Sequence, residues 1–526
     1  MRVQLNTGKW RMGAAVLALG ALCILAFGGG RRNGFVHYDD DLYVFGNPQV
    51  LNGLSWSGAR WAFTTGHAGN WHPLTWLSLM ADTEWCRGEA RGYHATNIAL
   101  HALNGILLFL VLRSWTGRFT CPLIAAALWA VHPLRVESVA WISERKDVLA
   151  MFFGLLALWT YGGAAAGMAR GRGRMGQVAL CHALSLMAKP TWVTLPFVLL
   201  LADAWPLGRW RKGAAGGLVA EKAPLFLLSA LSCAATLLVQ HAGGAMRTLT
   251  GHPPGLRLAN AAVAYAQYVR VLVWPADLAV FHPHPAGGPA AAGIAGALAL
   301  LLALMAGAAW TARRRPWWGV GWLWFLGTLV PMIGLVPVGG AAWAERYSYL
   351  PHIGLTLALV WGAGDLLRID APGAAWRRRF AGGLAVALAL GLALLARRQT
   401  ATWKDSETLF RRAVQATERN AMAHGALGFV LAGQGRDAEA VRELRTALAI
   451  QPDNLRAMNN LAWLLAMDTR ATSPQLAEAD NLARRAAAQV REARRAGVVL
   501  EPGVEAAVRD TLEKVESRRT GRPPSP

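Results

Sequence analysis

Long apolar runs separated by short loops are the feature that most constrains the fold of this chain. Most of them approach the roughly 20 residues that a helix needs to cross a bilayer core of about 30 Å. Only 16% of the residues are charged, against about 25% in ordinary soluble domains. The sequence therefore predicts an all-α, polytopic membrane protein with about eleven transmembrane helices, at residues 13–29, 95–112, 120–131, 147–163, 176–188, 191–205, 223–240, 289–310, 317–338, 350–366 and 380–396.

The basic residues indicate how these helices are oriented. A formal net charge of +22 would suit a nucleic-acid partner, but Lys and Arg collect in every second short loop. Short loops on the cytoplasmic side of a membrane carry such an excess. We therefore interpret the charge as topology and predict no nucleic-acid partner. Residues 13–29 are then an uncleaved signal anchor with the N-terminus inside, and residues 30–94 form a long loop outside.

One segment decides between eleven and twelve spans. Residues 258–275 are apolar enough to be a further span, but a span there would move the basic clusters at 313–315 and 376–379 to the outside. We therefore predict an interfacial or re-entrant helix at 258–275, eleven spans and an outside C-terminus.

The part of the chain after residue 396 has a different pattern. "NAMAHGALGFVLAGQGRDAEAVRELRTALAIQPDN" fits the 34-residue tetratricopeptide pattern. Gly428 and Ala440 are the small residues where the two helices of a repeat approach closely, and partial repeats flank this one in the same phase. We predict a membrane domain over 1–396, a tetratricopeptide-repeat α-solenoid over 397–495, and a capping helix with a disordered tail over 496–526.

Three consecutive carboxylates begin the long outside loop. Asp39, Asp40 and Asp41 stand in "FVHYDDDLYVFGNPQV", among aromatic residues typical of a packed loop. Like charges in a partly dry site raise one another's pKa, which gives one of them general-base character near neutral pH. The alternative is a solvated acidic turn that caps the next helix.

A polar stripe follows on the second apolar run. His94, Asn97, His101 and Asn104 have the spacing of one helix face. Polar side chains in a membrane helix face other helices or a wet cavity. Hydrogen bonding between helices is the favoured interpretation for His101 and Asn104. For His94, at the outer end, contact with a site is an equally good one.

Several cations are predicted at the same outer face. "HPLRVESVAWISERKDVLA" (132–150) places Arg and Lys where they can bind a lipid phosphate, or pair with carboxylates of their own loop. Lys189 lies between two apolar spans and needs an anionic partner, a phosphate or a carboxylate. Arg346 in "AERYSYLP" is either a phosphate ligand or the partner of Glu345.

A carboxylate base and several cations at the outer leaflet suit one reaction class. The substrate would be a lipid-linked phosphosugar whose headgroup reaches out while its tail stays in lipid. The carboxylate would take a proton from an acceptor hydroxyl, and the cations would stabilise the departing polyprenyl phosphate.

The motifs in their order resemble those of a known family. "FVHYDDDLYVFGNPQV", "NWHPLTWLSLMAD", "GYHATNIALHALN", "HPLRVESVAWISERKDVLA", "AKPTWVTLPFVLLLADAWPL" and "AERYSYLP", followed by the repeats, cover nearly the whole chain. They are similar to the transmembrane and tetratricopeptide-repeat protein O-mannosyltransferases, and in particular to bacterial relatives. These enzymes belong to the GT-C superfamily of polyprenol-phosphate-dependent glycosyltransferases.

The resemblance implies roles for individual residues. Asp39 and Asp40 match the family's catalytic acidic pair, with Asp39 as the base or acceptor-orienting group and Asp40 close behind it. The resemblance implies contacts with the donor phosphate or the active site for six further residues, His132, Glu137, Arg145, Lys146, Lys189 and Arg346. His94 is one more candidate, because of its position at the outer end of a predicted span.

The resulting prediction is a membrane glycosyltransferase that moves mannose from a polyprenyl-phosphate donor to a protein acceptor presented by the repeats. Its Ala/Arg-rich composition and bacterial-style motifs favour a bacterial inner membrane with the site and the repeats in the periplasm. The alternatives are a lipid or envelope-glycan acceptor, and a non-catalytic membrane scaffold. No ligand spacing argues for a metal, so no metal ligands are assigned and a divalent ion is left open.

Overall fold

The computed structural model describes residues 2–165, 171–242, 253–336, 339–369, 371, 373–496, 498, 500 and 503–520. Regular structure in these ranges is almost entirely helical. The one sheet among them has two short antiparallel strands, β1 (His282–Pro283) and β2 (Ala341–Trp343). The predicted all-α fold class is confirmed.

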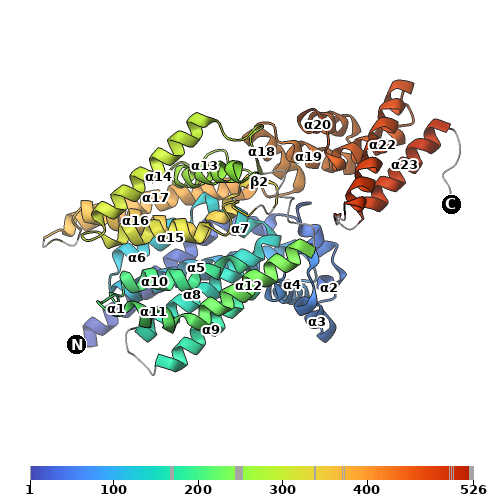
Figure 1. Ribbon diagram of the computed structural model, residues 1–526. Coiled ribbons are helices and arrows are strands. Elements are labelled where there is room, and N and C mark those ends of the chain that lie inside the picture. The colour runs from blue at the N-terminus through green and yellow to red at the C-terminus, as the bar shows by residue number, and fades with distance from the viewer. Residues whose placement is uncertain are drawn as a thin grey trace.

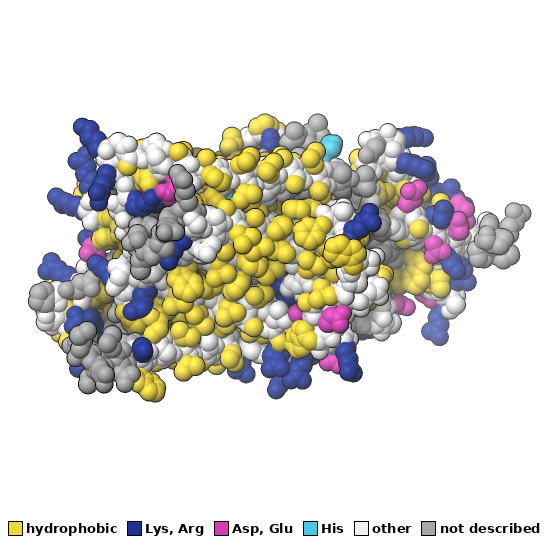
Figure 2. All heavy atoms as spheres, turned by 90° about the horizontal axis from the view of Figure 1, so that it is seen from below, with side chains coloured by type: hydrophobic (Ala, Val, Ile, Leu, Met, Phe, Trp, Pro, Cys, Tyr) yellow, Lys and Arg dark blue, Asp and Glu magenta, His cyan; other side chains and the backbone are white. Residues whose placement is uncertain are grey.

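Most helices before residue 402 lie side by side in an elongated bundle (Figure 1). The N-terminus marks one end of this bundle, and the helices that follow residue 405 lie beyond the other. On the face that Figure 2 shows, the surface between the two ends is largely hydrophobic. Lys and Arg gather at the N-terminal end, and others stand toward the opposite end and on the C-terminal part. The bundle helices are α1 (Arg2–Phe27), α5 (Ala90–Thr116), α6 (Thr120–Ala130), α8 (Arg145–Ala165), α9 (Gly171–Ala188), α10 (Leu195–Ala204), α11 (Ala215–Glu221), α12 (Ala223–Ala242), α13 (Pro254–Val273), α14 (Ala291–Thr311), α15 (Pro316–Leu329), α16 (Pro351–Leu366) and α17 (Ala375–Ala401).

Among the described residues, five segments are long and apolar enough to cross a membrane, which indicates a multi-pass membrane protein. A bent pair, Thr120–Ala130 with Pro133–Ala140, would make a sixth. The predicted number of eleven spans is therefore not confirmed. The five segments are Lys9–Arg32, Ala90–Thr116, Ala223–His241, Ala291–Thr311 and Ala375–Ala401.

A proline shortens one of the other predicted spans. The apolar run 317–338 was expected as one helix, but α15 ends at Leu329, two residues before Pro331. Proline has no N–H to continue the helix, and its ring clashes with the preceding turn. With 14 residues α15 is about 21 Å long at 1.5 Å per residue. Its expected extension to 338 is wrong.

The polar stripe on α5 ties the bundle together. His101 contacts the Tyr349 hydroxyl at 2.6 Å and the Ala130 carbonyl oxygen at 2.8 Å through its two ring nitrogens. Asn104 donates to the Val148 carbonyl oxygen at 2.9 Å. Hydrogen bonding between helices is thus confirmed for His101 and Asn104.

The first loop is packed, as its aromatic residues predicted. It contains a π-helical turn (Asp41–Phe45) and the helices α2 (Pro48–Leu51), α3 (Trp56–Thr64) and α4 (Pro73–Cys86). Tyr43 and Trp76 are buried, and their rings stack with centroids 4.7 Å apart. Asn47 caps α2 by accepting the Gln49 N–H at 3.1 Å. This core holds the acidic motif in a defined conformation.

Six helices follow the bundle in the part of the chain that the structure describes, each packed against the next. A Cβ atom at Gly428 would lie 2.7 Å from Leu444 Cγ, so a small residue is needed there, as the repeat pattern requires. The last helix continues through Arg518 and Arg519, which were expected in the tail, while residues 521–526 lie outside the described residues. The repeat assignment stays a prediction. The six are α18 (Ser406–Ala416), α19 (Ala421–Gly433), α20 (Asp437–Ile450), α21 (Leu455–Met467), α22 (Ser473–Arg495) and α23 (Val504–Thr520).

Close backbone approach between α15 and α16 leads to a first prediction. A Cβ atom at Gly321 would collide with the Gly354 carbonyl oxygen and lie 2.9 Å from Ala358 Cβ. We therefore expect Gly321→Ala to destabilise the protein by about 1–3 kcal/mol, the range for overpacking. Thermal unfolding in detergent would measure this. Gly319→Ala is the matched control, because its Cβ would meet nothing within 4 Å, and equal stability of the two variants would contradict the prediction.

Candidate active site

Asp40 is the structural member of the acidic motif. Its carboxylate is buried and accepts three hydrogen bonds, from the Val36 N–H at 3.0 Å, the Ser143 N–H at 3.0 Å and the Ser143 hydroxyl at 2.6 Å. Burial raises the pKa of Asp40 to about 7, although these hydrogen bonds favour the ionised form. Asp40 therefore fastens the first loop to the 3₁₀ turn Ile142–Glu144.

Asp39, its neighbour, is placed differently. Its φ of 64° lies in the left-handed region, which Asp tolerates better than most residues and which is frequent at functional sites. Its carboxylate accepts no hydrogen bond from any described residue. Burial raises the pKa of Asp39 above its ordinary value, and the nearby charges of Lys146 and Arg346 oppose that rise only in part. A half-buried carboxylate with free lone pairs is able to accept a proton.

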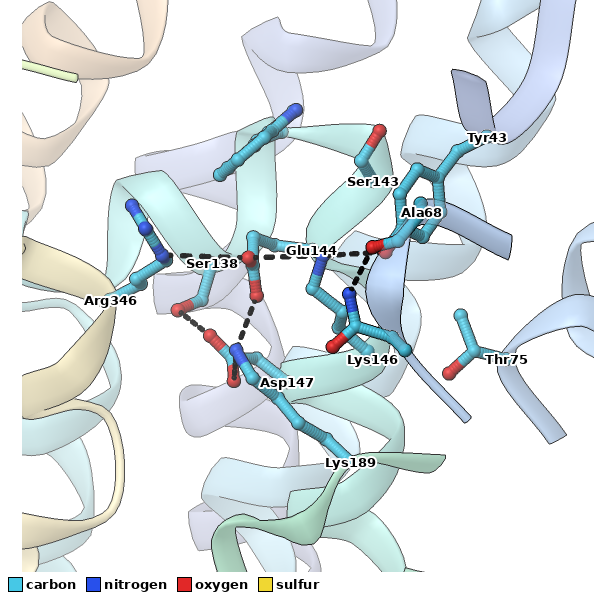
Figure 3. A network of polar contacts seen from close by, with 12 residues as sticks. Tyr43, Ala68, Thr75, Ser138, Ser143, Glu144, Lys146, Asp147, Lys189 and Arg346 are labelled. Atoms are coloured by element: carbon cyan, nitrogen blue, oxygen red, sulfur yellow. Dashed lines mark hydrogen bonds and ion pairs between the residues drawn. The ribbon is translucent and has the colours of Figure 1, made fainter. Parts of the chain in front are cut away.

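Six charged residues form an ionic cluster beside the first loop. Glu144 is at its centre, between Lys146, Lys189 and Arg346 (Figure 3). Five segments contribute to this cluster, which consists of Glu137 from α7 (Val136–Ala140), Glu144 from the Ile142–Glu144 turn, Lys146 and Asp147 from α8, Lys189 directly after α9, and Arg346 from the 3₁₀ turn Glu345–Ser348.

The contacts within the ionic cluster are short and mostly buried. Lys189 Nζ lies 2.8 Å from Glu144 Oε2 and 2.8 Å from Asp147 Oδ1, and Lys146 Nζ lies 3.3 Å from Glu144 Oε1. Arg346 pairs with Glu137 and lies 3.5 Å from Glu144 Oε1. Burial alone would raise the pKa of Glu144, but the three cations together lower it well below its ordinary value. Glu144 is therefore an anion that holds three cations in place.

Aromatic rings line the cationic side of this cluster. The Lys146 ammonium lies 4.4 Å from the centre of the Tyr43 ring, and the Arg346 guanidinium lies 5.4 Å from that of Trp141. Trp141 in turn donates its indole N–H to the Tyr38 carbonyl oxygen at 2.6 Å. Cations beside aromatic faces, next to a carboxylate, are the kind of surface that binds small polar ligands.

The structure brings five predicted residues together and leaves the others apart. Asp39 faces the cluster to which Glu137, Lys146, Lys189 and Arg346 belong. Lys189 was predicted to need a phosphate or a carboxylate as its partner, and in the structure it pairs with two carboxylates. Arg346 pairs with Glu137 rather than with the neighbouring Glu345, so that alternative was wrong.

Arg145 lies outside the ionic cluster. Its guanidinium is fully buried and pairs with Asp82 and Asn97, and it also donates to the Ser78 hydroxyl at 2.7 Å and the Tyr93 carbonyl oxygen at 2.9 Å. All of these partners belong to α4 and α5. The structure therefore favours a packing role over the predicted donor contact.

The two predicted histidines also have local partners. His132 contacts the Leu272 carbonyl oxygen at 3.0 Å through Nε2, and its Nδ1 accepts the Leu134 N–H at 3.3 Å. His94 Nε2 lies 3.4 Å from the Gly34 carbonyl oxygen. Burial lowers the pKa of His132 to about 3, so its ring is neutral and unsuited to neutralise a phosphate. Neither side chain contacts a member of the ionic cluster in the described structure.

Glu144 and Asp147 were predicted only as possible partners for the cations of their own loop, and Ser143 was not selected at all. All three stand in "WISERKDVLA", whose cations were selected. A segment of alternating charges next to an apolar run must pair its carboxylates as well as its cations, which was the available signal. Across the described ranges, no group of three or more His, Cys, Asp or Glu side chains could hold a metal ion.

Comparisons with known proteins give distant relatives that share one kind of name. The chain is 26% identical over 512 residues to "Protein O-mannosyl-transferase TMTC1" of Homo sapiens, which covers 86% of this chain and 57% of the human protein. It is 26% identical over 552 residues to "Protein O-mannosyl-transferase Tmtc1" of Drosophila melanogaster, covering 85% and 63%. It is 25% identical over 498 residues to "Protein O-mannosyl-transferase TMTC4" of Mus musculus, covering 82% and 66%.

These similarities define what the chain resembles. It is a helical membrane protein with a buried ionic cluster beside a packed acidic loop, and it is distantly related to proteins named protein O-mannosyl-transferases. The predicted resemblance is confirmed. The chain spans less than two thirds of the length of the human and Drosophila relatives. No family model matches the chain, and no solved structure matches it.

Proposed function

We propose that this chain is a membrane glycosyltransferase that moves mannose from a polyprenyl-phosphate donor to a hydroxyl group of a protein acceptor. The observation that carries the proposal is the carboxylate of Asp39, which is half-buried, free of hydrogen bonds from described residues and close to the charges of Lys146 and Arg346. The names of the relatives suggest the reaction class and the sugar. A purely structural scaffold would not need a carboxylate held without a partner.

The proposed chemistry uses each part of the site. Asp39 takes the proton from the acceptor hydroxyl as its oxygen forms a bond to the anomeric carbon of mannose. The bond between that carbon and the phosphate oxygen breaks, and polyprenyl phosphate leaves with the electron pair. The three cations stabilise the charge that develops on the phosphate. Asp40 is a positioning residue, because it holds the loop that carries Asp39.

The donor phosphate must compete with the protein's own carboxylates. The cluster contains three cations and three carboxylates, so its formal charges balance. A phosphate that enters adds negative charge and takes over contacts that Glu144 and Asp147 make to Lys189. This exchange keeps the cations paired when no donor is bound, which avoids the free-energy cost of buried unpaired charges.

The site is proposed to face the periplasm of a bacterial inner membrane. The first loop and helices α18–α23 share the end of the bundle opposite the N-terminus, and basic residues gather at the N-terminal end (Figures 1 and 2). A positive cytoplasmic face then puts the site outside. A periplasm-only reporter fused after the last residue should be active, and an inactive reporter would contradict this orientation.

Transfer by the purified full chain in lipid vesicles tests the function. Radiolabelled polyprenyl-phosphate mannose and periplasmic proteins should give labelled protein. Label in lipid or glycan instead would contradict the protein acceptor, and no transfer to any of these would contradict the glycosyltransferase itself.

Lys189→Met gives a quantitative form of this test. A lost charge-assisted contact costs about 1.5–3 kcal/mol, so we expect a loss of about 10- to 100-fold in kcat/KM for the donor. Lys404→Met is the matched control, because that side chain is 71% exposed. Equal losses in both variants would contradict the role of Lys189.

A further inference from the structure

A groove lies between the first loop and the C-terminal helices. It has a volume of about 690 Å³ and is bounded by Phe35 and His37 on one side and by α18, α19, α21 and α23 on the other. The two sides are joined directly, because the His37 N–H donates to the Ser406 hydroxyl at 2.8 Å. His37 is two residues from Asp39, so one wall of the groove belongs to the loop segment that carries the proposed base.

The charge of this groove is opposite to that of the chain. Asp405, Glu407 and Asp510 line it, and no Lys or Arg is among its described lining residues, in a protein with a net charge of +22. Glu407 is already paired with two arginines, but Asp510 is exposed and forms no ion pair with a described residue. Such a surface attracts cations and repels acidic segments.

Carboxamide groups stand ready to bind a peptide backbone. Asn459 and Asn460 are consecutive on α21 and face the groove, with Gln434 across from them at the end of α19. The Asn459 Oδ1 atom is buried without a hydrogen-bond partner. An unsatisfied buried acceptor costs about 1–3 kcal/mol, so a donor from a ligand is favoured there. A carboxamide matches both the N–H and the C=O of an extended backbone.

Exposed aromatic rings complete the groove. Phe429 is 50% and Trp463 is 39% exposed, which is high for such large apolar side chains. The His37 ring lies 5.9 Å from that of Phe429, so the aromatic surface continues into the first loop. These rings can bury apolar parts of a bound segment, including the methylene groups of Lys and Arg side chains.

We propose that this groove binds an extended, positively charged segment of the acceptor polypeptide and presents its hydroxyl residues to Asp39. The inference rests on the proposed function, because it names the class of acceptor. The carboxamides hold the backbone, the aromatic rings hold apolar parts of side chains, and the carboxylates select positive charge.

Binding of labelled peptides to the full chain in nanodiscs tests the groove. The probes are two fluorescent peptides of equal length, one alternating Lys and Thr and the other alternating Glu and Thr. We expect the Lys–Thr peptide to bind at least about tenfold more tightly, and Asp510→Lys or Asn459→Leu to weaken its binding by about five- to tenfold. Asp453→Lys is the matched control, an equal charge change on an exposed residue outside this groove, and should leave binding unchanged.

The outcomes separate the groove from the reaction. Equal binding of the two peptides, or unchanged binding in both Asp510→Lys and Asn459→Leu, would overturn the groove proposal. Asp39→Asn should bind the Lys–Thr peptide normally, because Asp39 does not line the groove. If the wild-type chain transferred no sugar while the groove variants weakened peptide binding, the proposed function would fail and the groove would stand as a polypeptide-binding site.

Discussion

Asp39→Asn is expected to lower the rate of sugar transfer by about 10²- to 10⁴-fold, the usual contribution of a general base, without loss of stability. A carboxamide cannot take the proton, yet it has the shape of the carboxylate. No hydrogen bond from a described residue is lost, and Asn is as well suited as Asp to the φ of 64° at this position. Initial rates in vesicles and thermal unfolding of the same preparations would measure the two effects separately.

Asp40→Asn is the matched comparison and should behave differently. Its amide NH₂ would replace one of the two acceptor oxygens and face either the Val36 N–H or the N–H and hydroxyl of Ser143, so at least one of these donors loses its acceptor. We expect a loss of about 1–3 kcal/mol in stability together with reduced transfer. Full transfer by Asp39→Asn would show that Asp39 is not the base, and a stable but inactive Asp40→Asn would give that role to Asp40.

The pH dependence of transfer gives a further readout of the same variant. A general base acts only when it is ionised, so the rate falls as the pH falls through its pKa. Burial raises the pKa of Asp39 above its ordinary value, and the acidic limb of the profile should therefore lie above the pH expected for a solvated aspartate. This limb should disappear in the residual activity of Asp39→Asn. An identical limb in both proteins would assign it to another group.

The sequence was sufficient for the helical class, the packed first loop and three of the four predicted cations, and insufficient for helix lengths and pairings. Apolar composition alone marked residues 317–338 as one span, although Pro331 ends the helix early. The average hydrophobicity of the whole run does not reflect the effect of a single proline on the helix. The helix ends before the proline even though the residues after it are apolar.

The partners of the cations could not be predicted from the sequence for a different reason. Arg145 and Lys146 are adjacent on α8, where successive side chains point about 100° apart, so one faces α4 and α5 while the other faces the ionic cluster. The order of the two residues in the sequence does not show which of them faces the ionic cluster. Likewise Arg346 reaches Glu137, distant in sequence, rather than adjacent Glu345, because tertiary packing determines which carboxylate it meets.

Arg145→Met tests this separation of adjacent cations and should have the largest effect on stability. Arg145 is fully buried and the Asp82 side chain is 5% exposed, so removing the guanidinium leaves a buried carboxylate without its cation. Breaking a buried pair in this way costs about 3–5 kcal/mol. Thermal unfolding in detergent should show that loss, and Lys146→Met should show much less, because Glu144 keeps Lys189 and Arg346 as partners.

A second substitution separates packing from donor binding. If Arg145 acts through Asp82, then Asp82→Asn combined with Arg145→Met should recover part of the lost stability, since the uncompensated charge is gone. The Thr96 hydroxyl, 2.8 Å from the other carboxylate oxygen, still has an acceptor in the Asn side chain. A stable Arg145→Met that only raised KM for the donor would instead restore the donor contact that the sequence predicted. Recovery in the double variant would assign Arg145 to holding α4 and α5 against α8, leaving Lys146, Lys189 and Arg346 as the cations available to the phosphate.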